Sequence, residues 1–490
     1  MRSAAALTVV FLALCISTAI GSTSANSHRF DVRQRRTDSH AKRSLGGALP
    51  ASEHPFAKRD ASTYMASTLP ENNEGEDHSD PQDSVPKGAR LTSIDVGSDG
   101  EQIATYISDK AENDKATHAF IMIHGKLRNG GEYWTTMNNV LQSAIDADYK
   151  GVDENAIIIA PQFYSTKFNE KQYSKNELAW PDVNAWQAGD PASHPDGTQL
   201  TSIDALDAII DSLADQDTYP ALTNVTVVGH GGGGQLGQRY ATIAKDQPSN
   251  IHIRYIHGDP SSGVYFTKDR PLTDESVANI TDCPLYNTWR YGFDNFTGTA
   301  DGLKKPEEYF QQYISRDVVS IVGYQDTTAG GDQYCMALLQ GGVARRDRNL
   351  AWWQYINTLA RTNEDLTGFP GNFSNLPDWS NLSQGIIGTK LVVVEDADHD
   401  AEKVFESDVG RAALFDVDNL PTGWRPKHWV QKPAIKKSVP SSSTSADSAR
   451  STDAVSEDDQ QSGAMSTLLK HPITLLSIAL AAGTASCLYL

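Results

Sequence analysis

The sequence is short of basic residues. Its 490 residues include 42 Lys and Arg against 62 Asp and Glu, so the formal net charge is -20 at pH 7. Nucleic-acid binders need clustered basic side chains to displace counterions from the phosphate backbone, so this composition argues against such a partner. Hydrophobic residues make up 39% of the chain, enough for one large domain with tails or for two modest domains.

Apolar periodicity is almost absent from residues 22–90, which follow a short apolar run at the N-terminus. Residues 1–21 combine an early Arg2, an apolar run and small residues at Ala19 and Gly21, which predicts a signal peptide and secretion. Residues 22–90 are rich in Ser, Asp, Glu, Pro and basic pairs, so they cannot bury enough apolar surface to order themselves. We expect a disordered segment there, either a pro-segment cut at its dibasic sites or a solvated charged tail.

The C-terminal region predicts membrane attachment. Residues 431–462 form a Ser/Thr-rich linker, and residues 463–490 supply small residues, a spacer and an apolar tail that begins at Ile473. These elements are typical of a GPI-attachment signal. An ordinary membrane span is the alternative, but no Lys or Arg follows the tail to hold a cytoplasmic end. We therefore expect a protein at the cell surface, with GPI anchorage preferred.

Cysteine is scarce as well. Cys15 and Cys487 lie in the predicted processed ends, which leaves Cys283 and Cys335 as the pair in the body of the chain. Secretion favours a disulfide between them, although two separate thiols would fit the sequence too. In a secreted protein, the five Asn-x-Ser/Thr sequons are also possible glycan sites. They begin at Asn224, Asn279, Asn295, Asn372 and Asn381.

Between the tails, apolar runs of strand length alternate with helical patterns, which predicts an α/β sheet with crossover helices in one domain over residues 91–430. The expected strands are 119–123, 156–160, 225–228, 253–257, 318–323 and 390–394. The expected helices include 136–147, 202–213, 235–245 and 402–415. An irregular segment at 264–312 is a candidate cap, and its aromatic residues could line an apolar pocket or simply pack together; they are Trp289, Tyr291, Phe293 and Phe296.

The most informative stretch joins a β-branched strand to a helix through glycines. Residues 229–234 read Gly-His-Gly-Gly-Gly-Gly, so Gly229, Gly231 and Gly233 occupy the first, third and fifth places of a G-x-S-x-G nucleophile elbow. In that motif the glycines let the chain turn sharply and expose the middle residue.

On these residues the chain resembles the α/β-hydrolase superfamily, and more narrowly its secreted esterase- or lipase-like members. The resemblance spans most of residues 117–415 and includes the strand that ends in His124-Gly125. It implies an α/β-hydrolase fold with a mostly parallel sheet, helices on both faces and a small irregular cap. It also implies that the backbone amides of Lys126 and Gly232 form an oxyanion hole.

The resemblance places the acid and the base of a catalytic triad after the elbow. Asp326 follows a strand end and would orient the base, and His399 follows the last strand and would be that base. Asp332 and Asp398 are the nearby alternatives for the acid.

The nucleophile departs from the family pattern. Gly231 stands where the serine belongs, and a glycine can neither attack a carbonyl nor form an acyl-enzyme. Ser261 and Ser262 follow the next strand and are weak candidates to replace it. Without a nucleophile, an oxyanion hole and binding leave only roughly 10³–10⁴-fold acceleration over water.

Three functions therefore remain open. The first is a catalytically impaired homologue that binds a small apolar or ester-like ligand, or a protein partner, at the cell surface. The second is an active carboxylic-ester hydrolase with an atypical nucleophile or with a water activated by Asp326 and His399. The third uses the same two residues as the base of a lyase or a cofactor-free oxygenase.

A dinucleotide site is a further alternative, because residues 229–234 also satisfy G-x-G-x-x-G and Asp259 ends the next strand. The dinucleotide unit normally opens its domain, whereas here two strands precede it. Gln235-Leu236 stands where a P-loop requires Lys-Ser/Thr. The sequence thus predicts no cofactor and no metal site.

Overall fold

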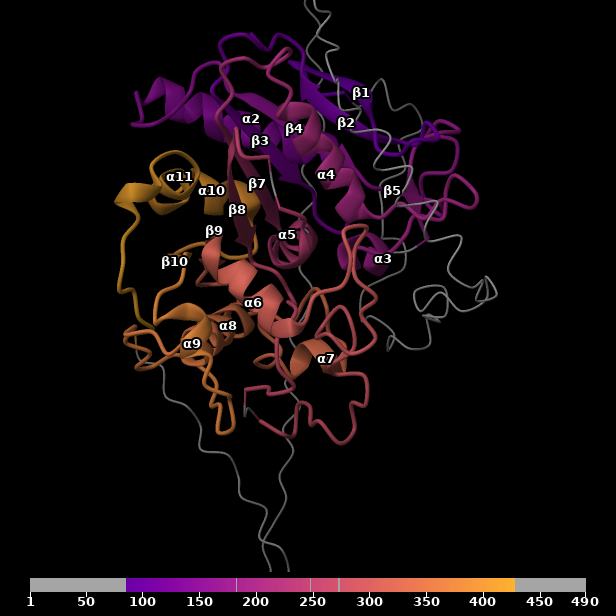
Figure 1. Cartoon of the computed structure of the whole chain (residues 1–490). Coiled ribbons are helices and arrows are strands. Elements are labelled where there is room, and N and C mark those ends of the chain that lie inside the picture. Colours follow the sequence, from indigo (N-terminus) through magenta and orange to yellow (C-terminus); the bar gives the residue numbers. More distant parts are fainter. Residues whose placement is uncertain (1–84, 182, 247, 272–273, 428–490) are drawn as a thin grey trace, which may run out of the picture. The chain divides into compact units, whose positions relative to one another are not determined.

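Most of the strands lie side by side in a single sheet. The structure is a computed structural model that describes residues 85–181, 183–246, 248–271 and 274–427 (Figure 1). Its main sheet has eight strands in the order β1-β2-β4-β3-β7-β8-β9-β10. Their bounds are β1 Ala89–Asp95, β2 Gln102–Ser108, β3 His118–Ile123, β4 Ile157–Gln162, β7 Asn224–His230, β8 His252–Gly258, β9 Asp317–Gly323 and β10 Thr389–Val394.

Strand direction changes only at one end of this sheet. β1 pairs antiparallel with β2, and β2 pairs antiparallel with β4. From β4 to β10 every neighbouring pair is parallel. The carboxyl ends of β3, β7, β8, β9 and β10 therefore lie at the same edge.

Helices cover both faces. α2 (Gly130–Asp146), α10 (Ala401–Glu406) and α11 (Asp408–Phe415) pack on one face, and α4 (Ser202–Leu213), α5 (Gly232–Ile243), α6 (Pro306–Ser315) and α8 (Arg345–Ala360) pack on the other (Figure 1). Successive strand residues point to opposite faces, so the buried strands read as continuous apolar runs. In β3, for example, Ile121 joins one core and Phe120 the other. This architecture confirms the predicted α/β class.

The remaining elements are short. They are β5 (Tyr164–Ser165) and β6 (Ala179–Trp180), which pair with each other, together with α3 (Val183–Ala188), α7 (Cys335–Leu338), α9 (Ser380–Ser383) and the 3₁₀ helix η3 (Val417–Asn419). Among the residues that the structure describes, no helix is both long and apolar enough to cross a membrane.

Several element boundaries differ from those expected. The expected helix 402–415 is two helices, because Ser407 has an extended backbone and its hydroxyl accepts a hydrogen bond from the Gly410 amide, which caps α11. α6 begins at Pro306, within the segment 264–312 that was expected to be irregular. β1 begins at Ala89, within the segment expected to be disordered.

The predicted disulfide is present. Cys283 and Cys335 are bonded, with their Cα atoms 5.9 Å apart, and the bond ties the irregular segment before α6 to the short helix α7. Of the five sequon asparagines, Asn295, Asn372 and Asn381 are exposed, whereas Asn224 and Asn279 are partly buried. The predicted signal peptide, nearly all of residues 22–90 and the predicted linker and tail at 431–490 lie outside the described residues.

Candidate active site

The loops that follow five parallel strands surround a cavity. It has a volume of about 450 Å³, and its lining includes residues that follow β3, β7, β8, β9 and β10. Open α/β sheets bind their ligands at this carboxyl edge. The lining residues used below are Lys126, Gln187, Gly231, Gly232, Gln235, Ser261, Thr328, Asp332, Tyr334, Arg345 and His399.

Gly231 is the turn between β7 and α5. It has φ 57° and ψ -112°, a conformation that L side chains rarely adopt, and it is the N-cap of α5. Its amide donates to the Gly258 carbonyl over 2.9 Å, and its own carbonyl accepts from the Gln235 amide over 3.0 Å. The turn is tightly packed, because a Cβ on Gly233 would collide with the Ile123 carbonyl. The backbone conformation is thus that of the sharp turn of a nucleophile elbow, and glycine adopts it without strain.

His399 lies directly beside this turn. A Cβ built on Gly231 would be 3.0 Å from His399 Nε2. The other ring nitrogen, Nδ1, is 2.9 Å from Asp326 Oδ2. A proton on Nδ1 satisfies that carboxylate and leaves Nε2 as an acceptor on the side of Gly231. The structure therefore brings together the three positions that the sequence assigned to nucleophile, acid and base.

Arg345 at the start of α8 joins this pair, and the sequence reasoning missed it. Its Nε lies 2.9 Å from Asp326 Oδ2 and 3.0 Å from His399 Nδ1. Asp326 is almost fully buried, at 1% exposure, so the guanidinium partly compensates a carboxylate that has left water. No motif marked Arg345, because its contact with Asp326 spans 19 residues of irregular chain and helix start.

Burial and neighbouring charge set the protonation of both groups. Burial lowers the pKa of His399, and the nearby His230 lowers that pKa further, against the opposing effect of the hydrogen bond that His399 donates to Asp326. Burial alone would raise the pKa of Asp326, but the hydrogen bond and charge of His399, together with the charge of Arg345, bring that pKa below its usual value. The pair is therefore a carboxylate beside a neutral imidazole near pH 7.

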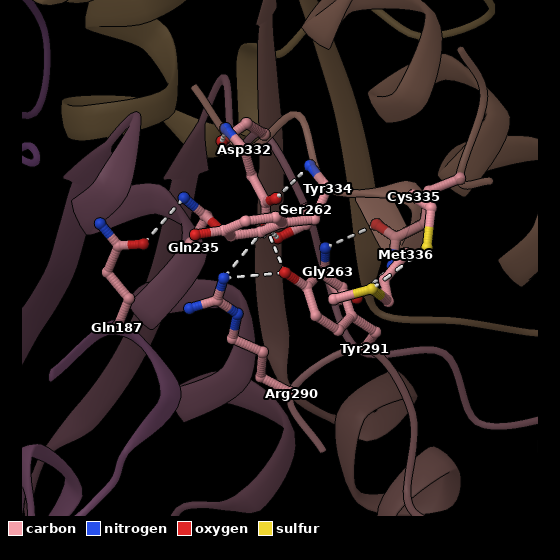
Figure 2. Close-up of polar contacts among 12 residues, drawn as sticks. Gln187, Gln235, Ser262, Gly263, Arg290, Tyr291, Asp332, Tyr334, Cys335 and Met336 are labelled. Carbon is pink, nitrogen blue, oxygen red and sulfur yellow. Dashed lines mark hydrogen bonds and ion pairs between the residues drawn. The ribbon is translucent and has the colours of Figure 1, made fainter. Parts of the chain in front are cut away.

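The other carboxylates considered for the acid lie elsewhere. Asp332 Oδ2 accepts hydrogen bonds from the Tyr291 hydroxyl over 2.7 Å and from the Ser262 hydroxyl over 3.0 Å (Figure 2). Asp398 is exposed to solvent. Of the three candidates, Asp326 is the one that contacts His399.

Ser261 and Ser262 both take part in hydrogen bonds that hold the cavity wall. The Ser261 hydroxyl accepts from the Asp332 amide over 3.0 Å. The Ser262 hydroxyl lies 2.6 Å from Gln235 Oε1, and Gln235 in turn donates to Gln187 over 3.1 Å (Figure 2). Neither serine contacts His399 in the structure described, and each is held by its own partners.

Lys126 and Gly232 meet at the cavity. A Cβ on Gly232 would lie 3.0 Å from the Lys126 backbone nitrogen, so the two backbone segments are in contact beside Gly231. The first amides of a helix such as α5 lack intrahelical acceptors. The assignment of these two amides to an oxyanion hole stays a prediction.

The aromatic residues of the irregular segment form packing contacts. The rings of Trp289 and Phe296 stack with centroids 4.0 Å apart, and Phe293 stacks on Tyr309 of α6 at 5.2 Å. Tyr291 is buried against the disulfide. None of the four expected residues lines the cavity, whose lining includes the polar side chains of Gln187, Gln235 and Asp332.

Asp259 and His230 form a second buried pair below His399. His230 Nε2 lies 3.3 Å from Asp259 Oδ2, and both side chains are at most 2% exposed. Asp259 also accepts the Gly323 amide over 2.9 Å. These contacts commit Asp259 to the protein interior, so they do not favour its expected alternative role as a ribose-binding acid.

Comparison with known proteins gives structural matches only. No protein-family model matches the sequence, and neither does any curated protein. A poly(3-hydroxybutyrate) depolymerase from Bordetella parapertussis matches with 18% identity and a TM-score of 0.43, over 68% of this chain and 92% of that one. A poly(aspartic acid) hydrolase from Sphingomonas sp. KT-1 matches with 16% identity and a TM-score of 0.43, over 65% and 95%.

A Pyrococcus furiosus esterase matches with 14% identity and a TM-score of 0.35, over 72% of this chain and 99% of that one. Such low similarity carries no inference about activity. The eight-stranded, mostly parallel sheet, the helices on both faces and the strand-glycine-helix turn at Gly231 are features of this chain itself. On these features, the chain has the α/β-hydrolase fold.

Proposed function

We propose that this protein is a catalytically impaired hydrolase homologue that binds a small carboxylate- or ester-bearing ligand in the cavity. One observation carries the proposal: Gly231 has the backbone of a nucleophile elbow and lies against His399 Nε2, but it offers no attacking atom. His399 and Asp326 keep the hydrogen bond of a base and its orienting acid. Placement at the cell surface through a C-terminal anchor is part of this proposal.

The chemistry of the cavity supports the choice of ligand. Its lining includes the cations Lys126 and Arg345, of which Arg345 is paired with Asp326, and the acid Asp332, which is bonded to Tyr291, Arg290 and Ser262. The N-terminus of α5 adds the positive end of a helix dipole beside Gly231. These features suit a carboxylate or a polarised carbonyl better than the purely apolar ligand that the aromatic residues suggested.

An active hydrolase is the second candidate. His399 Nε2 is an acceptor with no side chain between it and the Gly231 turn, so it could deprotonate a water molecule there. If this candidate is right, the wild-type protein hydrolyses esters, and the hydrolysis depends on His399. The impaired homologue requires that such hydrolysis be negligible.

Restoring the nucleophile should restore activity. We expect Gly231→Ser to hydrolyse p-nitrophenyl acetate at least about 100-fold faster than Gly231→Ala, because loss of the nucleophile in a working serine hydrolase costs on the order of 10⁶-fold. The two variants share the same backbone strain, which should cost each about 1–3 kcal/mol in unfolding free energy. His399 must shift slightly to admit either Cβ. Equal rates in two folded variants, assayed with a chelator present, would refute the assignment of Gly231, His399 and Asp326.

The restored activity should have an acid limb below pH 6.5. A general base works when neutral, and the pKa of His399 is lowered from 6.5, so activity should fall only as the pH drops through that lowered value. The sign for stability is the same. In the unfolded chain this histidine takes up its proton near pH 6.5, whereas in the folded protein its pKa is lower. The free energy of unfolding therefore falls as the pH drops from 6.5 towards the lowered pKa. A pH profile of kcat/KM for Gly231→Ser checks this, and an acid-limb midpoint above pH 6.5 would contradict the described environment of His399.

Ligand binding should depend on access to the cavity. Thr328 and Thr327 are neighbouring exposed residues, but only Thr328 lines the cavity. We expect saturation-transfer NMR to detect binding of short-chain carboxylates, such as butyrate, and of their methyl esters to the wild type. Thr328→Trp should abolish the signal by filling the cavity, and Thr327→Trp should preserve it. Absence of signal in the wild type, or equal signals in both variants, would count against the cavity as a binding site.

A further inference from the structure

Three potential metal ligands converge just below the Gly231 turn. His230 at the end of β7, Asp259 after β8 and His399 after β10 each place one ligand atom so that all three atoms lie within 4.8 Å of one another. Imidazole nitrogen and carboxylate oxygen are ligands that zinc and related transition metals take. The parallel sheet creates the cluster, because these three residues are far apart in sequence and meet only at its carboxyl edge.

The spacing suits a tetrahedral ion. Ligands about 2.1 Å from a zinc ion at tetrahedral angles are about 3.4 Å from one another. His230 Nε2 and Asp259 Oδ2 are 3.3 Å apart, close to that separation. The rings of His230 and His399 have centroids 4.5 Å apart and are tilted by 34°, so a small movement of the partly exposed His399 ring would complete the set.

Hydrogen bonds already orient two of the ligands. A ligating histidine usually donates its other ring N–H to a carboxylate or carbonyl, which fixes its ring and strengthens it as a ligand. His399 has this arrangement, with Nδ1 on Asp326 and Nε2 on the side of Gly231. The Asp259 carboxylate is held by the Gly323 amide at 2.9 Å and 3.2 Å.

Gly231 leaves the coordinating nitrogen accessible. A Cβ at this position would lie 3.0 Å from His399 Nε2 and 3.3 Å from Cε1, so any larger residue would crowd the nitrogen that must face the ion. His399 and Gly231 both line the cavity, so the His399 side of the cluster is open to it, whereas His230 and Asp259 are buried. Glycine at position 231 thus removes the nucleophile and at the same time leaves room for a cation.

Opposite charges around the cluster nearly balance. Arg345 contacts His399 and would repel a second cation, but its guanidinium is paired with Asp326. Asp259 supplies a further negative charge within the cluster itself. A divalent ion would thus lie among two carboxylates and one guanidinium.

We propose that His230, Asp259 and His399 bind one divalent transition-metal ion of the zinc class, with the remaining coordination position facing the cavity. The sequence predicted no metal site, because these ligands lie at or just beyond the ends of three different strands and match no short motif. The site is independent of the proposed ligand, since it depends only on the three side chains and on the space beside Gly231.

The test is a zinc titration of the full-length protein after treatment with a chelator and dialysis. Isothermal titration calorimetry should show one ion per chain bound at this site. His399→Ala should weaken that binding at least about 100-fold, more than loss of a supporting hydrogen bond would. Asp259→Asn should weaken it as well while keeping an oxygen acceptor for the Gly323 amide. Cobalt(II) should give the intense visible absorption of a tetrahedral site in the wild type and lose it in His399→Ala.

The matched control is His252→Ala. His252 is exposed and pairs with Asp317, at 3.0 Å, outside the cluster. This variant should bind zinc as the wild type does. The proposal is overturned if the wild type binds no zinc, or if folded His399→Ala binds it as tightly as the wild type, which would place the ion on other histidines of the chain. Because no ester or carboxylate is used, this outcome is separate from that of the ligand-binding experiments.

Discussion

The turn at Gly231 is the constraint on which the site depends. β7 lies within the parallel sheet, and α5 must pack back against β7 and β8, so the chain has to reverse within one residue at a positive φ. The backbone of Gly233 lies against that of Ile123, which leaves no space for a side chain at position 233. The turn thereby fixes where His399, Lys126 and the cavity meet, whether or not residue 231 carries a side chain.

Much of the fold could be predicted because the buried strands are apolar on both faces. The six expected strands exist with small differences at their ends. β1 was not predicted, since it is half-exposed along most of its length and lacks a continuous apolar run, and β2 was missed although its five central residues are buried. α8 begins with Arg345 and Arg346, and it is buried along much of its length, so it shows no polar face to mark it as an amphipathic helix.

The part of the site that could be predicted is the part that follows from the order of residues along the chain. Asp326 and His399 follow strand ends in the order typical of the fold, and that order was enough to place them beside Gly231. Arg345, and the pairing of His230 with Asp259, depend on tertiary contacts that no local pattern encodes. For the aromatic residues at 289–296 the sequence left a pocket lining and simple packing both open, and the structure shows packing, including contacts with α6.

The central claim is that a hydrolase site has kept its geometry and lost its attacking atom. The most direct measurement is intact-mass analysis of the purified wild-type protein after incubation with a fluorophosphonate, which traps activated serine nucleophiles. The account predicts no adduct, since Ser261 and Ser262 are held in other hydrogen bonds and Gly231 has no oxygen. A stoichiometric adduct on any residue that lines the cavity would contradict it.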